Sequence, residues 1–252
     1  MATEKTTRDK VIIITGSSRG IGYHLANRFI ESGFKVIGVS RSGTSIKHNN
    51  FQDVIMDVSN LSEIENLGNE IDLSSVHGII NNAGMHGPLG PFEKNDMTKW
   101  VETFYVNLFG GAALTQMCIP SLKKNNGFVI FLSGGGSGFA KPNFSAYSVS
   151  KTAVVRLAEN LAKELNPDVF VYCVAPGSNR TEMLEVAIKA GDDVKEKDVV
   201  DFKEPEDLCL FLADNKDLRY SGKFIHVKDN YKNWGEKEFS DEMYKLRRLK
   251  VL

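Results

Sequence analysis

The sequence VIIITGSSRGIG, residues 11–22, decides the fold. Its first four residues are β-branched and apolar without alternation, which is typical of a strand buried on both faces. The glycines that follow allow a tight turn and leave no Cβ atoms to hinder a ligand. Apolar residues then recur at helical spacing over residues 20–32, and Gly33 ends this helix. The stretch predicts a strand, a glycine-rich loop and a helix in succession.

The remainder of the chain repeats this alternation of strand and helix. Further strands are expected at residues 35–40, 53–56, 76–80, 128–132, 169–174 and 223–227. Further helices are expected at residues 98–124, 146–165 and 205–213. Strands that alternate with helices predict an α/β fold. We expect a three-layer Rossmann fold, a doubly wound parallel sheet of about seven strands with helices on both faces.

Composition places the chain among globular proteins. Of its 252 residues, 42% are hydrophobic and 25% are charged, with a formal net charge of −1. This balance gives no basic excess for a nucleic-acid partner. No apolar run approaches the roughly 20 residues that span a membrane. No linker divides the chain, so we expect one domain over residues 1–252, in which residues 231–252 form a C-terminal tail extension.

Cysteine usage and the amino terminus predict the compartment. Cys118, Cys173 and Cys209 are far apart and show no metal-ligand spacing. We read them as buried free thiols of a reducing cytoplasm, and we expect no metal site. Residues 1–10 are polar and lack the apolar core of a secretory signal. The expected location is therefore cytoplasmic.

The glycine-rich residues 15–22, which we name the first glycine loop, have the chemistry of a dinucleotide site. A pyrophosphate needs close backbone approach, N–H donors and the positive end of a helix dipole, and a strand–loop–helix unit supplies all three. The residues of this loop that we expect to contact a dinucleotide are Gly16, Ser18, Arg19, Gly20, Ile21 and Gly22.

The spacing TGxxxGxG resembles the short-chain dehydrogenase/reductase family, and other motifs of that family follow in its order. They are Asp57-Val58, Asn81-Asn82-Ala83-Gly84, Trp100 with Asn107, the YxxxK pair Tyr147 and Lys151, and Pro176-Gly177 with Thr181. The resemblance extends from about residue 10 to residue 227. It implies further dinucleotide contacts from Asp57, Val58, Asn82, Ala83, Gly84, Tyr147, Lys151, Pro176, Gly177 and Thr181.

Charge at the end of the second strand predicts the choice of cofactor. An acidic residue there would accept hydrogen bonds from the ribose 2′-hydroxyl of NAD and repel the 2′-phosphate of NADP. The segment instead reads Val39-Ser40-Arg41-Ser42, without an acid. Arg41, together with Ser42 and with Arg19 in the first glycine loop, favours NADP(H) over NAD(H). The alternative is that Arg41 is only a solvated residue at the end of a strand and contacts no cofactor.

Tyr147 and Lys151 are the candidate proton-transfer pair. Four residues apart on a predicted helix, both project from one face. A phenol has a pKa of about 10 and is a poor base at neutral pH, but a nearby ammonium favours the phenolate and is expected to lower that pKa. Tyr147 can then exchange a proton with a substrate oxygen while hydride moves at carbon. The resemblance implies that Lys151 also holds the nicotinamide ribose and that Asn107 joins a water relay behind it.

The expected catalytic serine is where the sequence departs from the family. The family places a serine 13 residues before the tyrosine, and here that position is Gly134, within the sequence LSGGGSG of residues 132–138. Glycines permit a local bulge, so a neighbouring serine can take the role. Ser133 is our first candidate and Ser137 the second. The alternative is that neither serine takes this role and that the catalytic site is weak or has lost its chemistry.

These observations favour an NADP(H)-dependent oxidoreductase that acts on a small carbonyl or secondary-alcohol substrate. The LSGGGSG run and the tail resemble those of short-chain reductases from bacterial surface-sugar pathways, which implies a sugar or nucleotide-sugar substrate. A dinucleotide-binding sensor or scaffold with an impaired serine position is the alternative. An epimerase or dehydratase is a third reading, but its usual TGxxGxxG loop and longer chain are missing. The helices at 98–124 and 150–165 resemble the family's interface, which implies a homotetramer or homodimer.

The basic residues at the end of the tail allow two interpretations. Lys245, Arg247, Arg248 and Lys250 can contact phosphate, or they can form a solvated terminus.

Overall fold

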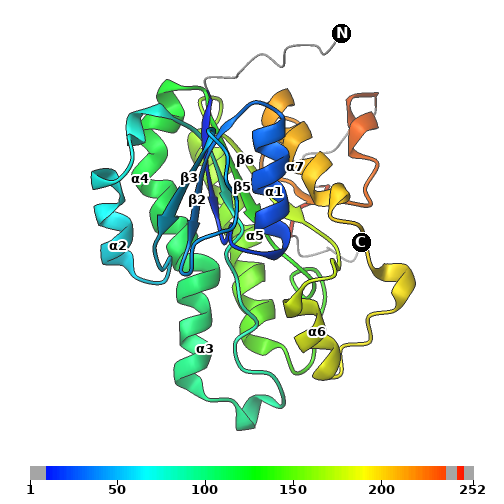
Figure 1. Cartoon of the computed structure of the whole chain (residues 1–252). Coiled ribbons are helices and arrows are strands. Elements are labelled where there is room, and N and C mark those ends of the chain that lie inside the picture. The colour runs from blue at the N-terminus through cyan, green and yellow to red at the C-terminus, as the bar shows by residue number, and fades with distance from the viewer. Residues whose placement is uncertain (1–9, 237–242, 247–252) are drawn as a thin grey trace.

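A computed structural model describes residues 10–236 and 243–246 of the chain. Its centre is one parallel sheet of seven strands in the order β3-β2-β1-β4-β5-β6-β7 (Figure 1). The strands are β1 (Val11–Thr15), β2 (Lys35–Ser40), β3 (Phe51–Ile55), β4 (Val76–Asn81), β5 (Phe128–Leu132), β6 (Phe170–Ala175) and β7 (Phe224–His226). The expected doubly wound Rossmann fold is confirmed.

Side chains of the central strands alternate between two hydrophobic cores, one on each face. Ile12 and Ile14 of β1 belong to the first core and Ile13 to the second, and all three are fully buried. The first core is covered by α1 (Gly20–Glu31) and α7 (Lys203–Asn215). The second is covered by α2 (Leu61–Asn66), α4 (Gly110–Lys124) and α5 (Ser145–Leu165). Burial on both faces explains why these strands read as unbroken apolar runs.

The long helix predicted at residues 98–124 is interrupted. It consists of α3 (Met97–Phe104), a π-helical segment (Tyr105–Phe109) and α4. A π segment inserts a wider turn and often occurs at functional sites. Spacing of apolar residues does not reveal it, because one extra residue in a turn hardly changes the pattern. In Figure 1, α3 and α6 (Glu182–Lys189) lie beyond the lower end of the sheet.

Smaller differences from the sequence expectations concern short elements. The third strand covers residues 51–55 rather than 53–56, since it pairs in register with β2 from Val36↔Phe51 onward. Helix α2 was not anticipated, and its polar first turn is capped by Asn60. Short 3-10 turns complete the described chain at Leu67–Asn69, Leu73–Ser75, Phe92–Lys94, Glu196–Asp198 and Tyr231–Glu236.

The described part of the C-terminal tail packs on the body. Trp234 is 3% exposed and stacks on Tyr220, and Tyr244 lies against Trp234 with 4.2 Å between ring centroids. The Phe224 N–H donates to Tyr244 O (2.7 Å). The tail is therefore ordered at residues 231–236 and 243–246. Arg247, Arg248 and Lys250 lie outside the described residues.

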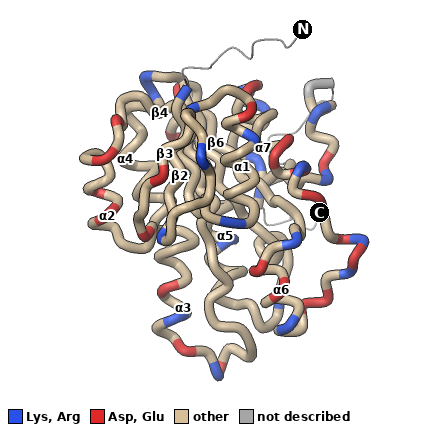
Figure 2. Tube along the Cα trace, in the orientation of Figure 1, with Lys and Arg blue, Asp and Glu red and all other residues tan. Residues whose placement is uncertain are grey.

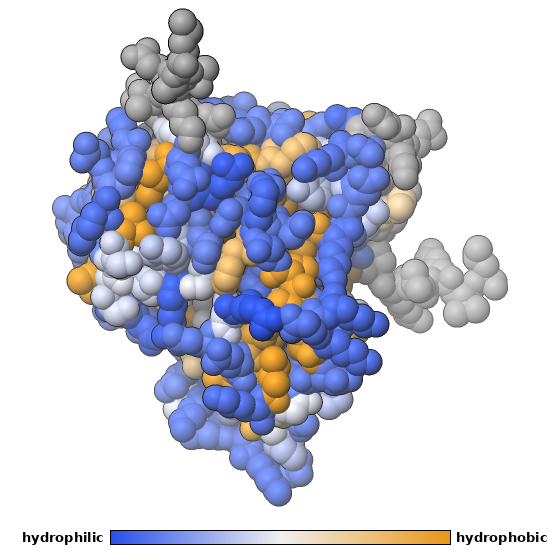
Figure 3. Space-filling model, turned by 45° about the vertical axis from the view of Figure 1, so that its right-hand side comes forward, coloured by the Kyte–Doolittle hydropathy of each residue, from blue (hydrophilic) through white to orange (hydrophobic). Residues whose placement is uncertain are grey.

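Charged side chains of both signs are interspersed along the described chain (Figure 2). On the face in Figure 3, hydrophobic side chains form a band flanked by hydrophilic ones. Four exposed apolar residues recur every fourth position along α3 and the π segment, a set that we name the α3 stripe: Met97, Val101, Tyr105 and Phe109. Among the described residues, no helix combines the length and apolarity needed to cross a bilayer.

Candidate active site

The first glycine loop follows β1 at the carboxyl edge of the sheet, where its backbone is fixed to both neighbouring strands. The Gly16 N–H donates to Val39 O on β2 (2.7 Å). On the other side, Asn82 Nδ2 donates to Thr15 O (2.8 Å), and Thr15 Oγ1 accepts from the N–H groups of Asn82 and Ala83 (3.0 Å each). The NNAG motif thus holds the loop in place.

The first glycine loop leads directly into α1, and the amino-terminal end of this helix has no side-chain cap. Arg19 is the N-cap of α1, and its side chain makes no capping hydrogen bond. The first N–H groups of the helix have no intrahelical acceptor, and α1 has no acid in its first turn. Backbone donors at a positive dipole end fit the pyrophosphate of a dinucleotide. Gly22 is required here because a Cβ on it would lie 2.2 Å from Gly16 O.

The two basic residues predicted beside the 2′-position differ in their surroundings. Arg19 pairs with Glu182 at the start of α6 (2.7 Å), and both side chains are about 70% exposed. Such an exposed pair is weak and leaves Arg19 able to exchange partners. Arg41 and Ser42 are exposed at the end of β2. Beside them, Ser40 Oγ is buried with no partner among the described residues, as expected of a group that awaits a polar ligand.

The other residues predicted to contact the dinucleotide lie along the same edge. Asp57 Oδ1 accepts from the N–H and hydroxyl of Ser59 (2.9 and 2.8 Å), and Val58 is buried. Pro176 and Gly177 directly follow β6. Thr181 caps α6 through its hydroxyl, and its methyl group lies 3.2 Å from a Cβ built on Gly20. The start of α6 therefore touches the first glycine loop.

Asn107 occupies the π segment, and all of its side-chain groups that could bond are engaged. Its Nδ2 donates to Met85 O and Ser150 Oγ (2.9 Å each), and its Oδ1 accepts from the Met85 N–H (2.8 Å). Built on Gly84, a Cβ would lie 3.3 Å from both Asn107 Oδ1 and Lys151 Nζ. The wider turn thus brings Asn107 to the NNAG loop and to the lysine of α5.

Lys151 and Tyr147 lie one turn apart on α5. The Lys151 ammonium donates to Leu132 O at the end of β5 (2.8 Å), and burial lowers its pKa to about 8. Burial, followed by the negative charge of Asp192, raises the pKa of Tyr147 to about 12. This direction is opposite to the one expected from the sequence. The ammonium is held by a carbonyl, and its charge does not offset the desolvation of the phenol in the protein alone.

Residues 133–138, which we name the second glycine loop, connect β5 to the catalytic pair. A Cβ built on Gly134 would lie 2.1 Å from Tyr147 Oη, so the phenol oxygen rests against this glycine. Ser133 Oγ lies within hydrogen-bond distance of Ser137 Oγ (2.9 Å) and Lys151 O (3.1 Å). The Ser137 hydroxyl donates to Gly134 O (2.5 Å). No hydrogen bond joins either serine to Tyr147 among the described residues.

A charged pair lies close enough to Tyr147 and His86 to influence their pKa values. Lys141 Nζ contacts Asp192 Oδ2 at 2.5 Å, and both side chains are less than one fifth exposed. Lys141 also lies over the Phe144 ring (4.5 Å), and His86 packs edge-on against Tyr147 (5.0 Å between centroids). Burial, and next the charge of Lys141, lower the pKa of His86 to about 4, so its ring is neutral at neutral pH.

The structure therefore brings together most residues that the sequence singled out. Lys151 and Asn107 both approach Gly84 of the NNAG loop, and Tyr147 lies one helical turn before Lys151 against Gly134, whereas the serine hydroxyls face the protein interior. Sequence reasoning missed Lys141 and Asp192. The ion pair joins positions 51 residues apart, and nothing in the local pattern signals it.

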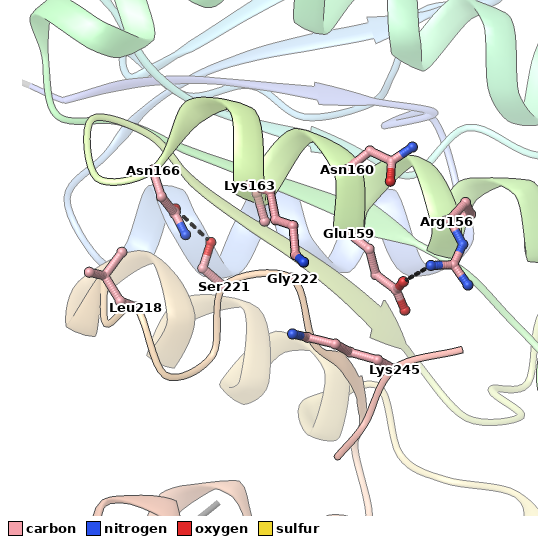
Figure 4. A pocket seen from close by; sticks show the side chains of 10 residues that line it. Arg156, Glu159, Asn160, Lys163, Asn166, Leu218, Ser221, Gly222 and Lys245 are labelled. Atoms are coloured by element: carbon pink, nitrogen blue, oxygen red, sulfur yellow. Dashed lines mark hydrogen bonds and ion pairs between the residues drawn. The ribbon is translucent and has the colours of Figure 1, made fainter. Parts of the chain in front are cut away.

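A cavity of about 520 Å³ lies elsewhere (Figure 4). It is lined by Arg156, Glu159 and Lys163 of α5 and by Lys245 of the tail. The helix rises about 1.5 Å per residue, so Lys163 is roughly 24 Å along α5 from Tyr147. Glu159 pairs with Arg156 (2.5 Å) and accepts from the Leu246 N–H (2.7 Å). The contact between Glu159 and Leu246 holds the described part of the tail on α5. The cavity is not part of the candidate active site.

Known proteins resemble this chain over most of its length. An oxidoreductase of Schizosaccharomyces pombe without assigned activity is 31% identical, across 88% of this chain and 98% of its own. A benzil reductase of Saccharomyces cerevisiae that forms (S)-benzoin is 34% identical, across 69% of this chain and 73% of its own.

A 3-ketoacyl-(acyl-carrier-protein) reductase from Brucella melitensis, solved with NADH, is one of the solved structures that resemble this chain. It superimposes with a TM-score of 0.80 at 24% identity, covering 88% of this chain and 98% of its own, and shows the shared fold. The sequence model of the short chain dehydrogenases matches residues 10–190. The chain belongs to the short-chain dehydrogenase family of oxidoreductases, which bind a nicotinamide dinucleotide and act on small molecules.

Proposed function

We propose that this protein transfers hydride between NADP(H) and the carbonyl or secondary alcohol of a small substrate. The observation that carries the proposal is the approach of Lys151 and Asn107 to Gly84 of the NNAG loop, whose Asn82 also holds the first glycine loop before the uncapped end of α1. When bound, the nicotinamide supplies or accepts the hydride. The whole chain acts as one catalytic domain in this proposal.

Tyr147 is the general acid in the reducing direction. With its pKa raised to about 12, the phenol is protonated at neutral pH and has a proton to give. As hydride reaches the carbonyl carbon, charge develops on the substrate oxygen, and Tyr147 Oη donates its proton there. In the oxidising direction the same oxygen must lose its proton first, which a high pKa favours less. In the protonated form, Tyr147 is ready to act in the reducing direction.

Lys151 and Asn107 support this proton transfer. Lys151, with a pKa near 8, is mostly charged at neutral pH and places a cation behind the reacting oxygen. Asn107 positions the NNAG loop through Met85 and the helix through Ser150. Ser133 remains the sequence's candidate for the substrate-binding hydroxyl, although its contacts with Lys151 O and Ser137 make it a positioning residue in this geometry.

NADP(H) is preferred in this proposal because Arg41 is exposed at the end of β2, Arg19 lies in the first glycine loop, and no acid ends β2. Titration with NADPH and NADH by cofactor fluorescence tests it. We expect NADPH to bind at least about tenfold tighter, roughly 1.4 kcal/mol. Arg41→Glu should abolish this preference, while Lys123→Glu, which makes the same charge change on α4, should keep it. Tighter binding of NADH by the wild type would overturn the preference.

The substrate is a small carbonyl compound. Benzil is the first probe, because a benzil reductase is 34% identical to this chain, and an aldohexose tests the sugar suggested by the sequence. NADPH oxidation with benzil supports the proposal. NADPH binding without turnover of any carbonyl would favour the sensor reading, which the glycine at position 134 keeps open. We also infer a cytoplasmic location, since all three cysteines are buried free thiols.

The α3 stripe supports a homo-oligomer. Its apolar side chains are 40–52% exposed along one helical face, an arrangement suited to burial against a second copy. We expect a homotetramer or homodimer in light scattering at micromolar concentration. A monomeric mass would contradict this expectation.

A further inference from the structure

The backbone around Gly134 occupies the place where the family has a serine. Because a Cβ on Gly134 would lie 2.1 Å from Tyr147 Oη, no side chain fits there while Tyr147 keeps its position. The phenol oxygen therefore contacts the main chain of the second glycine loop. Any substrate oxygen that receives the Tyr147 proton must lie next to the same main chain.

The two neighbouring serines have no proton left to offer a substrate. A hydroxyl carries one donor proton. The Ser137 proton is used on Gly134 O (2.5 Å), and the Ser133 proton is directed to Ser137 Oγ or Lys151 O. Both side chains are also buried, 3% and 4% exposed. Their hydroxyls hydrogen-bond to each other and to main-chain oxygens in the protein interior, and they do not extend into the candidate active site.

The main chain of the same loop has donors without acceptors. Residues 134–137 form a turn closed by the Ser137 N–H and Gly134 O (3.3 Å), with Gly136 at φ +91°. A positive φ at this third position is the pattern of a type II turn. Within the described chain, the N–H groups of Gly134, Gly135 and Gly136 make no hydrogen bond.

A buried side chain faces the same turn and is also unsatisfied. Ser148 follows Tyr147 on α5, is 9% exposed, and its hydroxyl has no partner among the described residues. A Cβ on Gly136 would lie 2.3 Å from this hydroxyl, so Ser148 is aimed at the turn. Polar groups that are buried and unpaired need an explanation, and a polar ligand atom beside Tyr147 supplies one.

We propose that the N–H groups of Gly134 and Gly135, which flank the Gly134 Cα, bind the substrate oxygen in place of a serine hydroxyl. This inference rests on the proposed function. During reduction, hydride with its electron pair reaches the carbonyl carbon and the C=O π bond breaks. The freed electron pair stays on oxygen, where the two N–H groups stabilise it until the Tyr147 proton forms the new O–H bond.

The replacement changes which substrates the site favours. A serine hydroxyl can both donate and accept, whereas a backbone N–H only donates. Two N–H donors are matched to a carbonyl or alkoxide oxygen, which only accepts. An alcohol must turn its own proton toward Tyr147 alone. The second glycine loop therefore stabilises most strongly the oxygen that carries no proton and develops negative charge, which is the alkoxide formed during reduction.

Two substitutions at one position test the donors. Gly135 is the second residue of the turn, where proline is favoured, and a Cβ there has no neighbour closer than 3.8 Å. Gly135→Ala adds only a Cβ, whereas Gly135→Pro also removes the N–H. With benzil and NADPH, we expect kcat of Gly135→Pro to be about 100-fold below that of Gly135→Ala at equal NADPH affinity. Ser133→Ala and Ser137→Ala should each stay at least about tenfold above Gly135→Pro.

Equal kcat values of Gly135→Pro and Gly135→Ala would overturn the inference, and so would a loss in Ser133→Ala as large as in Gly135→Pro. If Gly135→Pro fails to bind NADPH, wild-type protein labelled with ¹⁵N-glycine decides. Downfield shifts of the Gly134 and Gly135 amide protons with NADP⁺ and benzil support the donors, and unchanged shifts refute them. Absence of carbonyl reduction by the wild type contradicts the proposed function itself.

Discussion

The two glycine loops follow β1 and β5, two strands of one sheet that β4 separates, and their N–H donors become available for different reasons. The first, after β1, passes directly into α1, so its N–H groups are the unsatisfied end of a 12-residue helix. The second, after β5, makes an isolated turn, and its N–H groups are left free because Ser133 and Ser137 hold the loop from inside. A glycine-rich segment can thus become a donor site either through the helix that follows it or through a tyrosine that packs on it.

Removal of the Tyr147 hydroxyl is the most severe way to test the second loop. In Tyr147→Phe, kcat for reduction should fall about 100- to 10,000-fold, because the proton donor beside Gly134 is lost. NADPH affinity should remain. Tyr23→Phe, which removes a phenol oxygen from α1, is the matched control. A Tyr147→Phe enzyme that is as fast as this control would show that the donor lies elsewhere.

The loops should differ in their tolerance of one added methyl group. Gly22→Ala forces a Cβ to within 2.2 Å of Gly16 O, a backbone atom that cannot move aside easily. We expect overpacking of about 1–3 kcal/mol and at least tenfold weaker NADPH binding. Gly138→Ala in the second loop has no neighbour closer than 3.9 Å and should be nearly neutral. Thermal unfolding and cofactor titration of the pair measure the contrast, and similar losses in both would remove it.

The pH dependence of kcat for reduction reports the charge of Lys151, which lies close to the second glycine loop. Lys151 has a pKa lowered to about 8, so it is charged below this pH and neutral above it. Tyr147, with a pKa near 12, stays protonated throughout. We expect kcat for benzil to be level between about pH 6 and pH 8 and to fall by up to tenfold per unit above that. His86, with a pKa near 4, adds no change in this range. A loss of rate below pH 7 would contradict these assignments.

The smallest effect concerns the ion pair beside the second loop. Asp192→Asn leaves the largely buried Lys141 side chain without its charged partner. The free energy of unfolding should fall by roughly 1–3 kcal/mol. The exposed pair of Arg180 and Glu196 provides the control, since Glu196→Gln should cost less than about 1 kcal/mol. A raised KM for benzil in Asp192→Asn alone is expected as well. Equal melting temperatures of the two variants would mean that burial does not strengthen the first pair.

The sequence predicted the sheet well because strands buried on both faces are unbroken apolar runs, and the bounds of β2 and β5 matched. It also placed Tyr147, Lys151 and Asn107, since each belongs to a motif of fixed order. It could not predict the π segment at Asn107, because apolar spacing hardly changes there. Contacts such as Lys141–Asp192 depend on the folded path of the chain, and the raised pKa of Tyr147 depends on burial. Neither property is local in sequence.

The C-terminal segment protects the end of the sheet. Strand β7 is the last in the order, and the N–H of Phe224 on that strand is occupied by Tyr244 O (2.7 Å). An uncovered edge strand offers a template on which other chains can add. A chain cut after residue 236 would expose this edge together with the Trp234 ring that Tyr244 covers. The tail thus contributes to keeping molecules from joining edge to edge and aggregating.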